Sequence, residues 1–200
     1  MELLVIRHGQ SEADILKRIE GRADFPLTLL GKQQALLMAE WVKELYIPDY
    51  ILSSTLIRAS KTAQILSNKT DVEVQYYTDL MEFNNGLIAG LTKEEADAKY
   101  PPQKDKKPHE RFYEQETLIE FRLRAETILS KIIYEYPFDK RIAIISHGGM
   151  INMLFKSFLK LPVNCDVSIS TADTGIHLWK VDEDKRHIVF LNSTKHLINT

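Results

Sequence analysis

LLVIRHG, residues Leu3–Gly9, decides the fold of this 200-residue chain. Its first four residues form an uninterrupted apolar run, which is typical of a strand buried on both faces of a parallel sheet. The run stops at Arg7-His8-Gly9, so these residues stand at the carboxyl end of the strand. Because open parallel sheets bind ligands at that edge, this strand end predicts a functional site.

The same pattern recurs far along the chain. Arg141–Ser146 contains the apolar run Ile142–Ile145 and leads directly into His147-Gly148-Gly149. Two such strands in one parallel sheet present their carboxyl ends to the same crevice. We therefore expect His8 and His147 to lie close together, with the His8 ring open to solvent.

The remaining segments alternate between helix-like and strand-like patterns. Helices are expected at Thr28 to about Tyr46 (with Leu29, Leu36, Leu37, Ala39, Trp41, Val42 and Leu45 facing the core), at about Thr55–Ser67, from Thr92 to near Pro101, at about Leu118–Tyr136 and at Met150–Leu159. Strands are expected at Tyr50–Ser53, Val72–Tyr77, His177–Val181 and His187–Asn192, the last two joined by a charged turn, Asp182–Lys185. These patterns predict one domain over residues 1–200. It is an α/β three-layer sandwich whose mostly parallel central sheet is covered by helices on both faces.

Composition argues against several classes of protein. An apolar fraction of 44% and a charged fraction of 27% are close to globular averages and disfavour disorder. A net charge of -2 disfavours general nucleic-acid binding, which needs a basic face. No apolar run approaches the roughly 20 residues of a membrane-spanning helix. The one cysteine, Cys165, excludes an internal disulfide framework, so we expect a cytoplasmic protein without nucleic-acid or membrane partners.

The two histidine motifs suit phosphate chemistry. Neutral imidazole is a good nucleophile toward phosphorus, Gly9 would let an anion approach the backbone, and Arg7 would hold phosphate oxygens with its planar fork. His147 could donate a hydrogen bond to a phosphate oxygen. The alternative for each motif is a structural, hydrogen-bonded histidine at an ordinary strand end.

Two further side chains could complete such a site. Arg58 falls in the first turn of an expected helix, where a cation is unfavourable unless it faces an anion. Glu82 lies in a loop, and beside a phosphate dianion its carboxyl group could stay protonated and act as an acid. A solvated arginine and a solvated glutamate are the alternatives. Together the residues match phosphoryl transfer, whose transition state spreads negative charge over three oxygens, without a metal or a cofactor.

These segments resemble the histidine phosphatase superfamily in its phosphoglycerate mutase-like branch. The similar segments occur in family order and are Arg7–Ser11, Gly21–Gly31, Ser53–Ala63, Leu80–Gly90 and Ser146–Gly149. The resemblance implies a phosphoglycerate mutase-like fold and a phosphohistidine on His8. It also implies that Arg7, Arg58 and His147 clamp the phosphoryl group, and that Glu82 protonates the leaving oxygen and then helps to activate water.

The resemblance also suggests where substrate binds. Gln10 and Ser11 would lie near the pocket rim, and we assign Gly148 to substrate binding as well. Asp14 stands where the family often has asparagine, and Ala89 where it commonly has glutamate. Both departures bear on substrate fit rather than on the catalytic set.

Specificity and reaction type depend on the surrounding loops. Arg22, with Phe25 and the loop residues Lys104, Lys106, Lys107, His109 and Arg111, would meet a second anionic group, unless these cations are simply solvated. A small lid insertion at about residues 92–115, with a mobile Lys-rich loop at 101–115, favours hydrolysis of a small phosphorylated metabolite. A phosphoglycerate mutase-type transfer and a non-catalytic phosphate-binding module are the alternatives. The expected partner is a small phosphate ester, and a homodimer is compatible with this interpretation.

Overall fold

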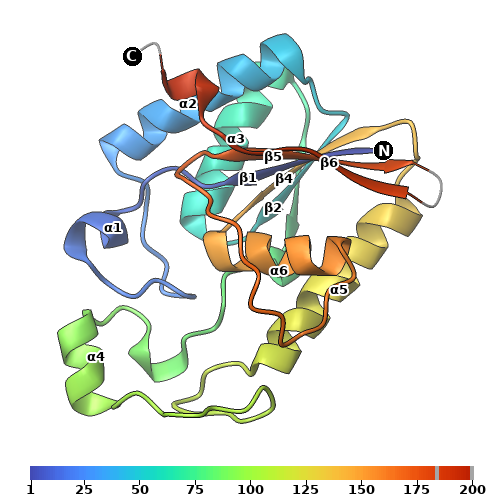
Figure 1. Cartoon of the computed structure of the whole chain (residues 1–200). Coiled ribbons are helices and arrows are strands. Elements are labelled where there is room, and N and C mark those ends of the chain that lie inside the picture. The colour runs from blue at the N-terminus through green and yellow to red at the C-terminus, as the bar shows by residue number, and fades with distance from the viewer. Residues whose placement is uncertain (183–184, 199–200) are drawn as a thin grey trace.

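The computed structural model describes residues 1–182 and 185–198 (Figure 1). Within them, six strands form one sheet in the order β3-β2-β4-β1-β5-β6. The strands are β1 (Glu2–Arg7), β2 (Tyr50–Ser54), β3 (Val74–Tyr77), β4 (Arg141–Ser146), β5 (Ile176–Asp182) and β6 (Lys185–Ser193). β3, β2, β4 and β1 run parallel, whereas β5 and β6 pair antiparallel at one edge. The predicted mostly parallel sheet is confirmed.

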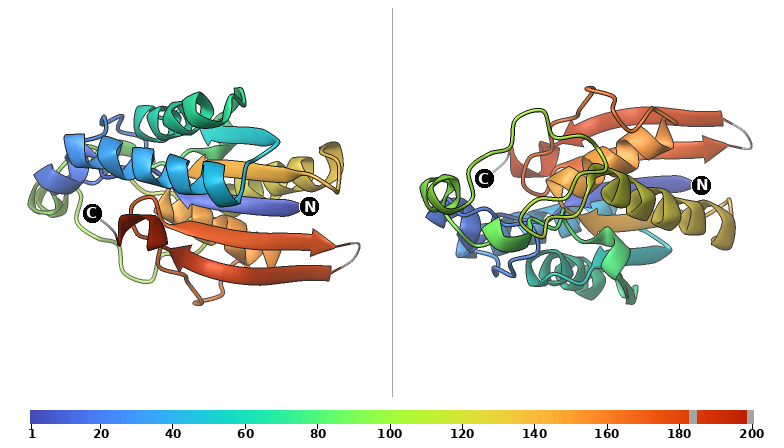
Figure 2. Two further views of the ribbon diagram at one scale, coloured as in Figure 1. Left: turned by 90° about the horizontal axis from the view of Figure 1, so that it is seen from above. Right: turned by 90° about the horizontal axis from the view of Figure 1, so that it is seen from below.

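Helices cover both faces of this sheet. They are α1 (Glu12–Leu16), α2 (Leu29–Leu45), α3 (Ile57–Thr70), α4 (Lys93–Lys99), α5 (Leu118–Glu135) and α6 (Gly148–Phe158). Short 3₁₀ turns occupy Thr78–Leu80, Gly86–Ile88 and Lys195–Leu197. Helix α2 lies over the sheet when the molecule is seen from above, and α5 and α6 lie over it from below (Figure 2).

Strand β1 contributes side chains to two hydrophobic clusters, one on each face of the sheet. Leu3 and Val5 point into the cluster formed with α5 and α6, whereas Leu4 and Ile6 point into the cluster formed with α2 and α3. All four side chains are fully buried. The uninterrupted apolar run therefore reflects burial on both faces, as predicted, because successive strand residues alternate between faces.

The expected core-facing stripe of α2 is partly wrong. Leu29, Leu36 and Leu45 are exposed, whereas the buried positions are Gly31, Ala35, Met38, Ala39 and Val42. The small residues of this face allow the helix to approach its neighbours closely, so the packed stripe follows glycine and alanine rather than leucine. Helix α1 was not predicted. The predicted turn Asp182–Lys185 includes residues 183–184, which lie outside the described residues.

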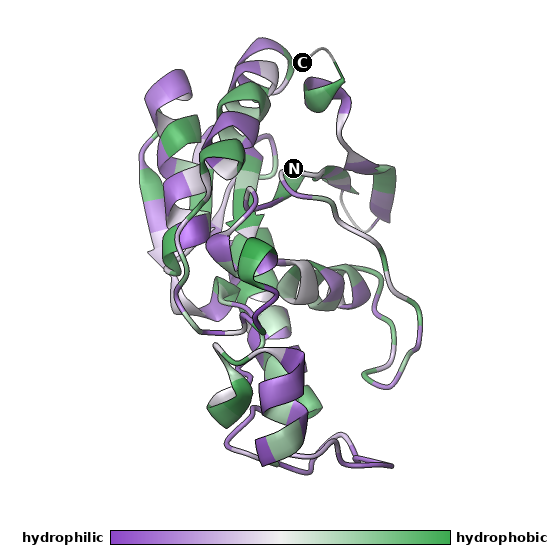
Figure 3. Cartoon of the chain, turned by 90° about the vertical axis from the view of Figure 1, so that its left-hand side faces the viewer, coloured by the Kyte–Doolittle hydropathy of each residue, from purple (hydrophilic) through white to green (hydrophobic). Residues whose placement is uncertain are grey.

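Residues 92–115 form a separate segment at one end of the molecule (Figure 1). Helix α4 begins with the predicted capping box, in which Thr92 Oγ1 accepts from the Glu95 amide and the Glu95 carboxylate accepts from the Thr92 amide. Residues 101–115 form turns, and their ribbon is mostly hydrophilic (Figure 3). That this segment acts as a lid stays a prediction. Within 1–182 and 185–198, no helix has the length and apolar character needed to cross a bilayer.

Candidate active site

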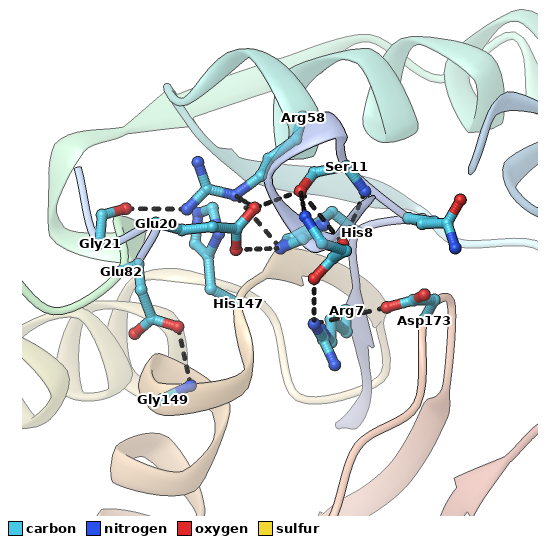
Figure 4. Close-up of polar contacts among 12 residues, drawn as sticks. Arg7, His8, Ser11, Glu20, Gly21, Arg58, Glu82, His147, Gly149 and Asp173 are labelled. Carbon is cyan, nitrogen blue, oxygen red and sulfur yellow. Dashed lines mark hydrogen bonds and ion pairs between the residues drawn. The ribbon is translucent and has the colours of Figure 1, made fainter. Parts of the chain in front are cut away.

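The carboxyl ends of β1 and β4 bring the two histidine motifs together. The strands are parallel neighbours in which Arg7 pairs with Ser146, and the His8 amide donates to the Ser146 carbonyl at 3.0 Å. The ring centroids of His8 and His147 are 5.0 Å apart (Figure 4). The predicted convergence of the two rings is thus observed.

One hydrogen bond decides which nitrogen of His8 can react. His8 Nδ1 lies 2.7 Å from the Gly9 carbonyl oxygen. Because a carbonyl only accepts, Nδ1 carries the hydrogen and Nε2 keeps its lone pair. Burial, reinforced by the charges of Arg58 and Arg7, lowers the pKa of His8 well below its usual value. The ring is therefore neutral near pH 7.

Gly9 packs closely against two helices, and its expected role in letting an anion approach the backbone stays a prediction. A Cβ at Gly9 would collide with the backbone oxygen of Gly31, in the first turn of α2. The Gly9 amide donates to Thr62 Oγ1 of α3 at 3.2 Å. The glycine therefore permits close packing of the histidine loop against α2 and α3, which holds the His8 backbone in place.

Arg58 is fully buried rather than solvated. Its Nε donates to His8 Nε2 at 3.2 Å, and its Nη1 and Nη2 donate to the carbonyls of Ala23 at 3.1 Å and Gly21 at 2.8 Å. At the N-terminus of the same helix, the Ile57 amide donates to the Asp24 carboxylate at 2.7 Å. The 20–24 loop thus offsets the unfavourable position of a cation in the first turn of α3.

His147 presents one ring nitrogen without a partner. Its Nε2 lies 2.8 Å from Ser54 Oγ, at the end of β2. Its Nδ1 is buried and has no hydrogen-bond partner among the described residues, and the same holds for Arg7 Nε. Burial, together with the Arg58 charge, lowers the pKa of His147 well below its usual value. A neutral His147 that accepts from Ser54 would carry its hydrogen on Nδ1, free to donate to an anion.

Arg7 is held by a second loop. Its Nη1 donates to the Thr171 carbonyl at 2.9 Å. Its Nη2 lies 3.4 Å from Asp173 Oδ1 and 3.9 Å from Asp14 Oδ1. Burial raises the pKa of Asp173. Arg7 is thus partly neutralised by carboxylates of the chain.

The Glu82 side chain extends from the loop after Leu80 to the start of α6 (Figure 4). Its Oε1 accepts from the Phe83 amide at 2.7 Å and its Oε2 accepts from the Gly149 amide at 2.9 Å. Arg124 donates to the carbonyls of Met81 at 2.7 Å and Glu82 at 3.1 Å, which anchors the loop. These contacts disagree with the alternative of a freely solvated glutamate.

Of the remaining predicted binding residues, Ser11 faces the site and Gly148 adjoins open space, whereas Gln10 and Arg22 contact other parts of the chain. Ser11 is fully buried and its hydroxyl faces the site, whereas the Gln10 amide oxygen accepts from Thr28 Oγ1 at 2.9 Å, beside α2. A Cβ at Gly148 would meet no atom within 4 Å, so the space beside it is open. Arg22 is 38% exposed and its Nη2 lies 3.9 Å from Glu116 Oε2.

The predicted loop cations bind mainly within their own segment. Lys106 Nζ donates to the Gln115 side chain at 3.0 Å, and Arg111 donates to the Gln115 carbonyl at 3.1 Å and contacts Glu120. A substrate role for these residues therefore stays a prediction. In the part of the chain that the structure describes, no group of three or more His, Cys, Asp or Glu could hold a metal ion.

Glu20 is a site residue that the sequence interpretation missed. Its Oε1 lies 3.4 Å from Arg58 Nε and accepts from Ser11 Oγ at 2.5 Å, and its Oε2 lies 3.8 Å from His8 Nε2. The expectation that the His8 ring is open to solvent is wrong, since its side chain is only 1% exposed. The Glu20 carboxylate lies over the ring at its Nε2. The one sequence signal was position, since Glu20 immediately precedes Gly21 in a family-like segment.

Comparison with known sequences finds one matching family model and several similar proteins. The family model described as histidine phosphatase superfamily (branch 1) matches residues 3–194. A protein named probable phosphoglycerate mutase GpmB, from Escherichia fergusonii, is 30% identical over 182 residues, spanning 84% of this chain and 83% of that protein. A Bacillus subtilis protein named uncharacterized phosphatase PhoE is 30% identical over 150 residues, spanning 75% of this chain and 73% of that protein.

Solved structures share the whole fold. A mycobacterial glucosyl-3-phosphoglycerate phosphatase complexed with VO3 has a TM-score of 0.85 at 27% identity, covering 96% of this chain and 98% of that one. A phosphoserine phosphatase from Entamoeba histolytica, in complex with 3-phosphoglyceric acid, has a TM-score of 0.81 at 28% identity, covering 98% of this chain and 99% of that one. The predicted phosphoglycerate mutase-like fold is confirmed.

Proposed function

The chain belongs to the histidine phosphatase superfamily, branch 1, and from this premise we propose that it hydrolyses a small phosphate monoester through a phosphohistidine on His8. The state of His8 carries the proposal. The ring is neutral, its Nδ1 hydrogen is held by the Gly9 carbonyl, and its Nε2 lone pair faces Arg58 beside His147. A nucleophilic histidine needs a neutral ring with a lone pair on the attacking nitrogen, and the Arg58 guanidinium group that donates to this nitrogen is also placed to hold a phosphoryl oxygen.

In the first step, His8 Nε2 attacks phosphorus and the bond between phosphorus and the ester oxygen breaks. Glu82 gives its proton to the leaving oxygen, while Arg7, Arg58 and His147 donate to the three remaining phosphoryl oxygens. In the second step, water attacks phosphorus, Glu82 takes a proton from it, and the N–P bond breaks. Inorganic phosphate leaves, and His8 returns to its neutral state.

The relatives support a small, acidic substrate. The two solved phosphatases named above act, by their names, on glucosyl-3-phosphoglycerate and on phosphoserine, and one was solved with 3-phosphoglyceric acid bound. We therefore favour a small phosphorylated metabolite over a phosphoprotein for this chain. A cytoplasmic location and a homodimer stay predictions.

Trapping of the covalent intermediate tests the proposal. We expect the wild-type protein, incubated with ³²P-labelled phosphoserine or 3-phosphoglycerate in chelator and quenched in alkali, to retain label, whereas His8→Ala retains none. A parallel screen of unlabelled phosphate esters should give turnover that chelator does not reduce. Equal labelling of His8→Ala, or turnover that requires Mg²⁺, would contradict the mechanism.

Transfer to another hydroxyl group is the second candidate, because several relatives are named probable phosphoglycerate mutases. The labelled enzyme distinguishes the two reactions when it is chased with buffer alone or with unlabelled phosphoglycerate. We expect the label to appear as inorganic phosphate in both chases. Label that passes to phosphoglycerate faster than to water would instead assign a mutase, and tight phosphate binding without any labelling would assign a binding module.

A further inference from the structure

The reactive nitrogen of His8 is covered by a carboxylate of the chain itself. Glu20 Oε2 lies 3.8 Å from His8 Nε2, and Glu20 Oε1 is shared between Ser11 Oγ at 2.5 Å and Arg58 Nε at 3.4 Å (Figure 4). Reacting atoms must approach to about 3–3.5 Å before a bond forms. The Glu20 carboxylate therefore stands where the oxygens of a phosphoryl group bound to His8 would have to lie.

The charge balance of the site makes this overlap costly. Among the described residues, carboxyl groups surround the two guanidinium groups of the site. They are Asp14, Glu20, Asp24, Glu82 and Asp173. A phosphate dianion that entered without change would add two negative charges to a cluster that already holds more carboxylates than guanidinium groups. Like charges a few ångströms apart repel strongly in a buried site.

We propose that Glu20 is an internal competitor of the substrate, whose carboxylate occupies the phosphate position in the free protein and must be neutralised or turned aside before an ester binds. The inference rests on the proposed function in one respect, that His8 marks the phosphate position. It adds a residue that determines the affinity for phosphate esters and its dependence on pH.

The local structure permits this movement without unfolding of the loop. The backbone around Glu20 is anchored by Ile19, whose amide donates to the Leu91 carbonyl at 2.8 Å and whose carbonyl accepts from the Gly90 amide at 2.7 Å. The Glu20 side chain itself is 16% exposed, so it has a route toward solvent. A rotation of one side chain thus uncovers His8 while Arg58 keeps its two backbone carbonyl partners.

Protonation provides the second route. The titratable groups that face Glu20 are Arg7 and His8 at the end of β1, Asp14 in α1 and Arg58 in α3. Burial outweighs the attraction of Arg58 and raises the pKa of Glu20. His8 is neutral, so it adds no positive charge that would hold the carboxylate ionised. As pH falls, Glu20 loses its charge and competition with phosphate ends.

Calorimetric titration with inorganic phosphate from pH 5 to pH 8 tests the inference on the full chain. At pH 8 we expect Glu20→Gln to bind phosphate about tenfold or more tightly than wild type, since one like charge is removed. The difference between the two proteins should shrink as the pH falls toward 5, because burial raises the pKa of Glu20 and the wild-type carboxylate is progressively protonated.

Two further variants make the result specific. Glu12→Gln removes the same charge from an exposed position of α1 and should leave phosphate affinity within about twofold of wild type. Glu20→Ala removes the carboxylate together with its cover over His8 and should behave like Glu20→Gln. If wild type binds phosphate but both Glu20 variants show its affinity and pH dependence, the inference is overturned and the proposed function stands. If no variant binds phosphate at any pH, the inference fails, and the labelling of His8 alone decides the proposed function.

Discussion

At the scale of single residues, hydrogen bonds to neighbouring groups determine which ring nitrogen of each site histidine is available to a substrate. His8 Nδ1 donates a hydrogen bond to the Gly9 carbonyl, so Nε2 is the ring nitrogen that keeps a lone pair. His147 Nε2 is hydrogen-bonded to Ser54 Oγ, so among the described residues Nδ1 is the ring nitrogen without a partner, and it could donate to an anion. Arg58 reaches His8 and two backbone carbonyls at once, which the single ammonium group of lysine cannot do in the same plane.

The acid role of Glu82 gives a prediction that depends on the substrate. Glu82→Gln keeps an oxygen that can accept from the Gly149 amide, but it has no proton to give to the leaving oxygen. We expect kcat/KM for alkyl phosphates to fall by about 10²–10⁴, the usual range for a lost general acid. With p-nitrophenyl phosphate, whose leaving group needs no proton, the fall should be much smaller. Equal losses for both ester classes, measured by steady-state kinetics, would remove Glu82 from this role.

At the scale of elements, the start of α6 connects the two strand-end motifs to the acid. His147 follows β4 directly and is the N-cap of α6. In the first turn of α6, the Gly149 amide donates a hydrogen bond to the Glu82 carboxylate. Gly149 leaves room for that contact, because a Cβ there would collide with the Glu82 carboxylate. The helix start therefore sets the distance between the acid and the nucleophile.

A pair of matched substitutions tests this arrangement. Gly149→Ala should displace Glu82 and lower kcat by about 10- to 100-fold, since misplacement by an ångström costs that much. Gly148→Ala adds the same methyl group one residue earlier, where a Cβ meets no atom within 4 Å, and should lose less activity. Both proteins should melt near the wild-type temperature. Equal losses in kcat from the two variants would show that the contact with Glu82 is not what matters.

At the scale of the whole molecule, buried neutral histidines link the fold to pH. Burial lowers the pKa values of His177 and His196 to about 4, and those of His8 and His147 also lie well below the usual value. His177 Nδ1 accepts from the Asn192 amide, so a proton on that nitrogen would leave two donors facing each other. These rings stay neutral in the folded protein over a range in which the unfolded chain is protonated.

The sign of the resulting effect is fixed by proton binding. Below about pH 6.5 the unfolded chain binds more protons than the folded one, so the free energy of unfolding falls as pH drops toward 4. Each such histidine adds up to about 1.4 kcal/mol per pH unit to the slope. Glu20 and Asp173, with raised pKa values, act in the opposite direction by stabilising the folded state in acid.

Urea unfolding at a series of pH values between 7 and 4 measures this slope. His177→Gln should reduce the slope of the free energy of unfolding against pH by about the contribution of one histidine. His109→Gln, at an exposed position in the 101–115 loop, should leave it unchanged. A wild-type stability that does not decline over this range would contradict the neutral state of the buried rings.

Much of the fold, and the placement of the two histidine motifs at strand ends, followed from local pattern, whereas the roles of Arg58 and Glu82 were implied by the family resemblance and stay predictions. The apolar runs before His8 and His147 predicted strands buried on both faces, because no polar side chain interrupts them, and two such strands in one parallel sheet could place both rings at the same edge. That β4 and β1 are direct neighbours was decided by the strand order of the sheet. The capping box at Thr92 similarly predicted the start of α4. Hydrophobicity was a poorer guide in α2, where close packing selected Gly31 and Ala35 over exposed leucines.

Only the tertiary structure decided how the site is closed. In sequence, Glu20 is a charged residue in a loop, a type that is normally solvated. It reaches His8 because Arg58 donates hydrogen bonds to the carbonyls of Gly21 and Ala23. These bonds hold the 20–24 loop over the end of β1. Residue periodicity reports which face of an element is buried, because that pattern repeats along the chain. A single side chain filling a pocket depends on contacts from several elements, which no local pattern records.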